Sequence, residues 1–115
     1  MKTKLDEMIV RLSASDDLVN IAVSEKVPGA DEYSIWIKEM KTRYEEINAS
    51  GTSVSDKLRK MRRLRADSMS ADIPVQYNRQ REIWVEFLDS VIQRLVLLVK
   101  HNPGGNIGSG RKRNI

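Results

Sequence analysis

The segment from about Val75 to His101 constrains the fold more than any other part of the chain. Large apolar residues recur along it with the 4-3-4-3 spacing of a helical heptad stripe: Trp84, Leu88, Val91, Leu95 and Leu98. A second apolar row runs beside this stripe and leaves only a narrow polar strip. A helix that is apolar over most of its circumference has to be covered on several sides, by other helices or by a second copy of the chain. We therefore predict a helical bundle, in which this stripe also serves self-association and makes the chain a homo-oligomer.

The end of this segment leaves one alternative open. Residues 94–100 read RLVLLVK and are rich in branched apolar side chains, so they would also suit a buried strand. No other segment offers a partner strand, which favours the helix. Charged residues such as Glu86, Asp89 and Arg94 interrupt the apolar run, whereas a membrane span needs about 20 nearly uninterrupted apolar residues. We expect no integral membrane association.

Apolar spacing predicts two helices in the first half of the chain. The first covers about residues 5–22, either as one kinked helix or as two short helices with Ser15 as a fresh N-cap. The dipeptide Pro28-Gly29 then predicts a loop. The second helix starts near Asp31 and carries a 4-3-4-3 apolar stripe as far as Ile47.

A third helix is expected between this stripe and the last helix. Gly51 lies among small polar residues and predicts a break, although the apolar spacing continues across it as if one long helix were only weakened there. Ser53 or Ser55 would be the N-cap of the new helix. We expect that helix to end near Met69, because turn-forming residues and Pro74 follow.

Residues 102–115 contain four of the six glycines and little that would stabilise an ordered structure. They predict a flexible tail that ends in the basic triplet Arg111, Lys112 and Arg113. The predicted fold class is therefore all-α: a small bundle of about four helices forming a single domain, 1–101, with a flexible basic C-terminal tail, 102–115. The N-terminus lacks the apolar core of a secretory signal, so we expect a cytoplasmic protein, or one inside a virion or a host nucleus.

Composition narrows the chemistry. The chain has no cysteine and one histidine, which excludes thiol chemistry and Cys/His zinc sites. His101 follows Lys100 at a predicted helix end, where a positive charge favours the negative helix terminus. The glycine-rich run near Gly104 does not lie between a strand and a helix, so it lacks the context of a phosphate-binding loop. We expect no enzyme activity, no cofactor and no metal.

Charge is distributed unequally along the chain. Residues 1–50 carry 7 basic and 10 acidic side chains, whereas residues 51–115 carry 13 basic and 6 acidic ones. Six cations occupy nine consecutive positions of the predicted third helix: Lys57, Arg59, Lys60, Arg62, Arg63 and Arg65. Like charges three and four residues apart repel on a helix, which indicates that something anionic offsets the cost. Guanidinium groups match phosphate oxygens bidentately, so the run predicts contacts to a nucleic-acid backbone, DNA or RNA, with little sequence readout.

Other basic residues extend this prediction, and other anions compete with nucleic acid as the ligand. Arg79 and Arg81 would enlarge the patch if the third and fourth helices pack antiparallel, and the tail triplet would add a second element. The alternatives are a solvated helix whose cations pair with the acidic first half, an acidic protein partner, and an anionic membrane surface.

The function that these patterns favour is non-catalytic nucleic-acid binding, of the kind that suits a phage, virus or plasmid accessory or packaging protein. The alternative function is a helical adaptor or chaperone that holds a partner protein on a wide apolar helix face.

Overall fold

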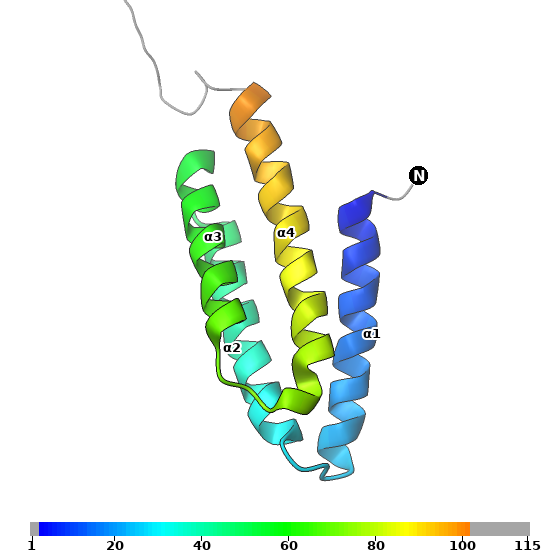
Figure 1. The fold of residues 1–115 in the computed structure, drawn as a ribbon. Helices are drawn as coiled ribbons and strands as arrows, with labels where there is room; N and C mark the ends of the chain where they lie inside the picture. The colour runs from blue at the N-terminus through cyan, green and yellow to red at the C-terminus, as the bar shows by residue number, and fades with distance from the viewer. Residues whose placement is uncertain (1–2, 102–115) are drawn as a thin grey trace, which may run out of the picture.

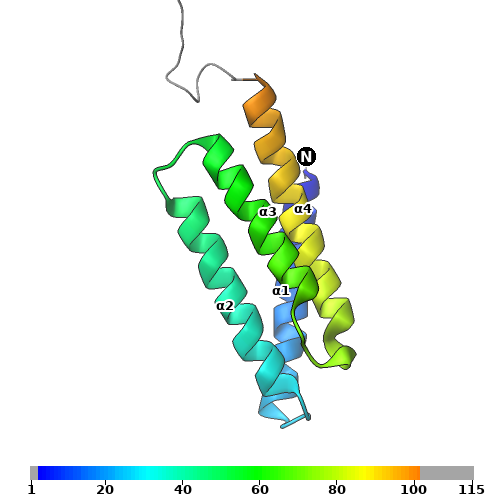
Figure 2. The same ribbon diagram turned by 60° about the vertical axis from the view of Figure 1, so that its left-hand side comes forward.

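Four antiparallel α-helices, connected in simple up-and-down order, make up the molecule (Figure 1). The computed structural model describes residues 3–101. Helix α1 spans Lys4–Ser24, α2 spans Ala30–Ala49, α3 spans Val54–Ser70 and α4 spans Asn78–His101, with a 3-10 turn, η1, at Val75–Tyr77. Each helix packs against its two neighbours in a ring, in which α4 contacts both α3 and α1 (Figure 2). The all-α bundle is confirmed, and residues 94–100 are helical, as favoured over the strand. The tail 102–115, including Arg111, Lys112 and Arg113, lies outside the described residues.

Helix α1 is a single continuous helix, so the alternative of two short helices with Ser15 as an N-cap is wrong. Ser15 faces the interior and is 4% exposed, which is why the polar cluster around it does not interrupt the helix. The true N-cap is Thr3. Its hydroxyl accepts a hydrogen bond from the Asp6 backbone N–H at 3.1 Å, and the Asp6 carboxylate accepts one from the Thr3 N–H at 3.1 Å.

The predicted loop at Pro28-Gly29 is confirmed, and it is held against the connection between α3 and α4. Gly29 has φ 84°, a left-handed conformation that favours glycine. A Cβ at this position would lie 3.2 Å from the Pro74 ring. The Gln76 side-chain amide also donates a hydrogen bond to the Pro28 carbonyl oxygen. Both loops therefore meet at one end of the bundle.

The break at Gly51 is also confirmed. Helix α2 ends at Ala49 and α3 begins at Val54. Ser53 is the N-cap, because its hydroxyl accepts a hydrogen bond from the Asp56 backbone N–H at 3.1 Å. The two helices thus pack side by side instead of continuing as one.

The core is centred on the first half of α4. Trp84 and Leu88 are 1% and 0% exposed, and they pack with inward residues of the other helices. The Trp84 indole N–H donates to the Ser68 hydroxyl at 2.9 Å, and that hydroxyl donates to the Leu64 carbonyl at 2.8 Å. The one polar atom of the largest core side chain is therefore satisfied.

Burial changes the interpretation of the heptad stripe on α4. Trp84, Leu88 and Val91 are buried by the chain's own helices, and no α4 residue beyond Val91 is buried. The other helices of the same chain cover these three side chains, so a second copy of the chain could not contact them. Leu95 is only partly buried and Leu98 is 42% exposed, so Leu95 and Leu98 are the residues of the predicted self-association stripe that the chain's own helices leave accessible.

Within residues 3–101, no helix is long and apolar enough to cross a membrane.

Candidate nucleic-acid interface

Helix α3 presents a sharply divided surface. Met61, Leu64 and Ser68 point into the core and are at most 1% exposed. The cations that interrupt them in the sequence therefore lie on the sides and the outer face of the helix. The Arg59 and Arg63 side chains are 72% and 79% exposed. The spacing in the sequence therefore predicted correctly that Arg59 and Arg63 face solvent.

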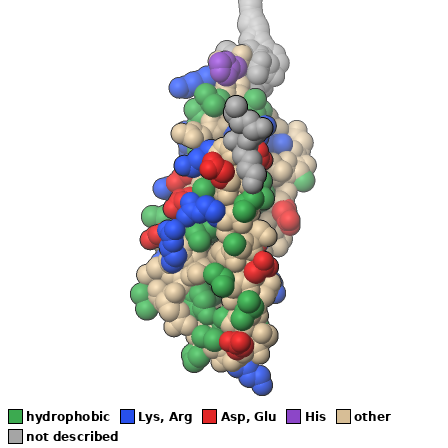
Figure 3. All heavy atoms as spheres, turned by 90° about the vertical axis from the view of Figure 1, so that its right-hand side faces the viewer, with side chains coloured by type: hydrophobic (Ala, Val, Ile, Leu, Met, Phe, Trp, Pro, Cys, Tyr) green, Lys and Arg blue, Asp and Glu red, His purple; other side chains and the backbone are tan. Residues whose placement is uncertain are grey.

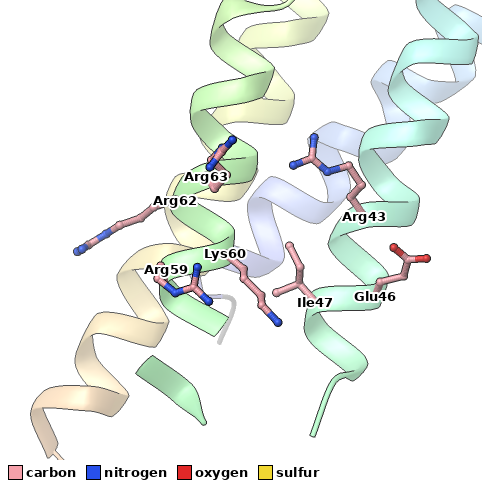
Figure 4. A pocket seen from close by; sticks show the side chains of 7 residues that line it. All are labelled: Arg43, Glu46, Ile47, Arg59, Lys60, Arg62 and Arg63. Carbon is pink, nitrogen blue, oxygen red and sulfur yellow. The ribbon is translucent and has the colours of Figure 1, made fainter. Parts of the chain in front are cut away.

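Four of the six cations converge with residues of α2 on one open groove of about 660 Å³. The groove lies between α2 and α3, as Figure 4 shows, and it is lined by Arg43, Glu46, Ile47, Arg59, Lys60, Arg62 and Arg63. Arg43 points from α2 toward α3, whereas Arg62 points away from α2 (Figure 4). Five cations thus line the groove with a single carboxylate, and this set is called the basic groove below.

Arg43 is the member of the basic groove that sequence reasoning missed. Arg43 lies in residues 1–50, where acidic side chains outnumber basic ones, so the charge distribution along the sequence did not mark it as part of a basic patch. Its spacing could have predicted the position of its side chain. Arg43 follows Met40 by three residues and precedes Ile47 by four, which places it at the edge of the apolar stripe of α2. A residue at such an edge faces the next helix once the two helices pack antiparallel.

Two aspartates bridge the cations of the basic groove. Asp56 lies 2.6 Å from an Arg59 nitrogen and 3.1 Å from Lys60 Nζ. Asp67 lies 2.8 Å from an Arg43 nitrogen and 3.7 Å from Arg63 Nε, so it links α2 to α3.

These contacts keep both carboxylates charged. Hydrogen bonds from Arg59 and Lys60 lower the pKa of Asp56 to about 2. A hydrogen bond from Arg43 lowers the pKa of Asp67 below its ordinary value. The four bridged cations are therefore held in place by fixed negative charges, and each remains partly exposed to solvent.

The rest of the basic run is engaged differently. Arg65 pairs with Asp89 on α4, and Lys57 Nζ donates to the Asn48 carbonyl oxygen at 3.1 Å. Arg62 makes no ion pair with any residue between 3 and 101. The repulsion among the six cations is thus reduced within the chain, but not by the acidic first half as one alternative supposed, because Asp56, Asp67 and Asp89 all belong to the basic half.

Arg79 and Arg81 do not join the basic groove. Helices α3 and α4 do pack antiparallel, but this places both arginines beside the C-terminal end of α3, whereas the groove lies along its N-terminal half. Arg81 Nη1 donates to the carbonyl oxygens of Met69 and Ala71 at 3.1 and 2.7 Å, and so caps α3. Arg79 pairs with Glu82 at 3.1 Å. Arg81 lines a hollow between α3 and α4 together with Arg65 of the basic run. Neither Arg79 nor Arg81 lines the basic groove, so the wider patch stays a prediction.

No cluster of three or more His, Asp or Glu side chains that could hold a metal ion occurs in the part of the chain that the structure describes. His101 lies exposed at the end of α4, with Lys100 beside it. Comparison of the chain with protein-family models, with curated proteins and with solved structures finds no match.

Proposed function

We propose that the chain is a non-catalytic protein that binds the phosphate backbone of nucleic acid in the basic groove. The observation that carries the proposal is that Arg43 from α2 and Arg59, Lys60, Arg62 and Arg63 from α3 line one open groove. Four of these five cations are arginines, whose guanidinium forks bind phosphate oxygens bidentately.

The spacing of the most exposed cations on α3 indicates the size of the contact. Arg59, Arg62 and Arg63 lie on one turn of α3 and therefore span about 6 Å along the helix axis. That length covers two or three phosphates of one strand, given a rise of about 3.4 Å per nucleotide. The described cations thus support fewer contacts than one for each of the six cations of the basic run, because the aspartates and Asn48 occupy part of their hydrogen-bonding capacity.

Base readout in the groove would depend on its arginines reaching base edges in the major groove of a duplex. Its lining has no aromatic side chain on which a base could stack, and its one apolar member is Ile47. Neighbouring helices also flank α3, whereas the major groove, about 12 Å wide, admits a single helix. We therefore propose binding that follows the backbone and is largely independent of sequence. The cytoplasm, a virion or a host nucleus would each supply such a ligand.

A salt titration tests this proposal. If three phosphates are neutralised, the affinity of the full chain should fall between 50 and 200 mM salt by about 40-fold for duplex DNA and by about 20-fold for single-stranded DNA. Fluorescence anisotropy with a labelled 20-nucleotide probe measures this dependence. Absence of binding at 50 mM salt would contradict the proposal.

We further propose that a second copy covers the C-terminal end of α4. Leu97 and Leu98 are 52% and 42% exposed there, and the last turns of α4 rise beyond the ends of α1 and α3 (Figures 1 and 2). Sedimentation of the chain and of the variant L97S/L98S tests this. A dimer that the variant dissociates supports the proposal, and a monomeric parent chain contradicts it.

A further inference from the structure

Helix α1 is apolar on two opposite faces. One face lies in the core, where Met8 and Val19 are 4% and 3% exposed. The opposite face carries Val10, Leu18 and Ile21, which are 55%, 60% and 53% exposed, with the exposed Ala14 between them. Figure 3 views the molecule from the side on which α1 lies and shows hydrophobic side chains with both acidic and basic ones among them. The four residues Val10, Ala14, Leu18 and Ile21 are called the outer row of α1 below.

The outer row is accompanied by negative charge. Glu7, Asp17 and Glu25 lie three or four residues from members of the row, at both of its ends and near its middle, and all three are exposed. None of them makes an ion pair with a residue of the described range, 3–101.

The cations of α1 are directed elsewhere. Arg11 is paired with Glu86 of α4 at 2.8 Å, and Lys4 lines a hollow between α1 and α4. The surface around the outer row is therefore apolar and acidic.

We infer that the outer row of α1 binds one amphipathic helix of a partner protein, whose apolar face is flanked by Lys and Arg. The row spans 12 residues from Val10 to Ile21, or about 17 Å, which is three turns of a helix. Three half-exposed side chains and an alanine offer an area well short of the roughly 800 Å² per partner of a standard protein–protein interface. The area thus fits a single docked helix better than a second globular surface.

The three carboxylates beside the outer row determine which charge the partner helix must carry. Cations beside its apolar face would meet Glu7, Asp17 and Glu25, which have no other partner among the described residues. A second copy of α1 would instead bring its own three carboxylates against these. A nucleic acid or an anionic membrane would be repelled in the same way. The site is independent of the basic groove, which lies between α2 and α3, so the chain would join a nucleic-acid backbone to a basic helical protein.

Two synthetic peptides of about 14 residues test the inference. Both carry leucine at helical a and d positions; one has lysine at the flanking positions and the other has glutamate. We expect the lysine peptide to bind the full chain and the glutamate peptide not to bind, as measured by fluorescence anisotropy of the labelled peptide. The variant L18S/I21S should weaken binding of the lysine peptide by about tenfold or more.

The matched control is Ile35→Ser, because Ile35 is 63% exposed on α2, away from the outer row. Its peptide affinity should equal that of the parent chain, and circular dichroism should show that both variants keep their helices. Equal loss with I35S, no loss with L18S/I21S, or equal binding of both peptides would overturn the inference. A dimer of the parent chain that L18S/I21S dissociates would also overturn it, by showing that a second copy occupies the row.

Discussion

Helices α1 and α3 occupy equivalent places in the bundle, since each packs against α4 on one side and against α2 on the other, yet they present opposite surfaces. Helix α3 is apolar on its buried face and largely cationic on its outer face, with Met69, 53% exposed, near its C-terminal end. Helix α1 is apolar on both sides and its outer row is accompanied by carboxylates. Two helices can therefore contribute equally to one core while their outer faces differ in polarity and charge, because the core constrains only the inward third of each helix.

The largest expected difference in the free energy of unfolding is between a substitution on the inner face of α3 and one in the outer row of α1. Leu64 is 0% exposed, so Leu64→Ala should lower the free energy of unfolding by about 2–5 kcal/mol. Leu18 is 60% exposed, so Leu18→Ala should change it by no more than about 0.5 kcal/mol. Urea unfolding of both variants measures the difference. Equal losses would show that the outer row is part of the fold and not a free surface.

The next effect concerns the C-terminal end of α3. Arg81→Gln removes a charged donor from the carbonyl groups of Met69 and Ala71, and it should cost about 1.5–3 kcal/mol in urea unfolding. Arg79→Gln is the control, because the exposed pair Arg79–Glu82 is worth no more than about 1 kcal/mol. If both variants lost the same stability, Arg81 would not be the cap that distinguishes α3.

The N-caps provide a comparison in which α1 and α3 should agree. Thr3→Ala and Ser53→Ala each remove a side-chain oxygen that accepts a hydrogen bond from a first-turn N–H. Each should cost about 1 kcal/mol, measured by thermal or urea unfolding. A much smaller loss for Thr3→Ala would mean that α1 frays at its start, and the outer row would then be shorter than proposed.

The smallest expected effect is a change in how the free energy of unfolding depends on pH in the acidic range. The pKa of Asp56 is lowered from 3.8 to about 2 in the folded chain, so this carboxylate stabilises the fold above its ordinary pKa, and that contribution is lost as the pH falls toward 2. Asp56→Asn should therefore flatten the loss of stability between pH 4 and pH 2. Carboxyl chemical shifts measured over the same range should show Asp56 titrating below the other exposed aspartates that have no such partners. A titration midpoint near 3.8 would contradict the bridge to Arg59 and Lys60.

The sequence predicted the elements because their limits depend on local chemistry. Pro28-Gly29, Gly51 and Pro74 stop helices through their own backbone preferences, and Ser53 is recognisable as a cap from its immediate neighbours. The prediction for Ser15 was wrong because its neighbours in the sequence resemble those of an N-cap, whereas packing against other helices buries it in the middle of α1. Local signals determined where the helices end, and tertiary contacts determined which polar residues the helices bury.

The candidate site was only partly predictable for the same reason. The basic run could be assigned to a surface from its spacing with Met61 and Leu64. Arg43, Arg81 and Asp67 act through contacts between segments that are 10 to 24 residues apart in sequence, and the charge pattern alone carries no information about those contacts. Asp56 differs, because it pairs with Arg59 and Lys60 three and four residues away on α3 itself.

The central claim is that the basic groove holds a nucleic-acid backbone, and one comparison of affinities tests it most directly. Affinity for a labelled DNA duplex should be measured at 50 mM salt for the parent chain, for R59Q/R62Q/R63Q and for the matched variant R79Q. We expect the triple variant to bind at least about tenfold more weakly, since three phosphate contacts are removed, and R79Q to bind like the parent chain. Binding of the triple variant that equals that of the parent chain would contradict the claim.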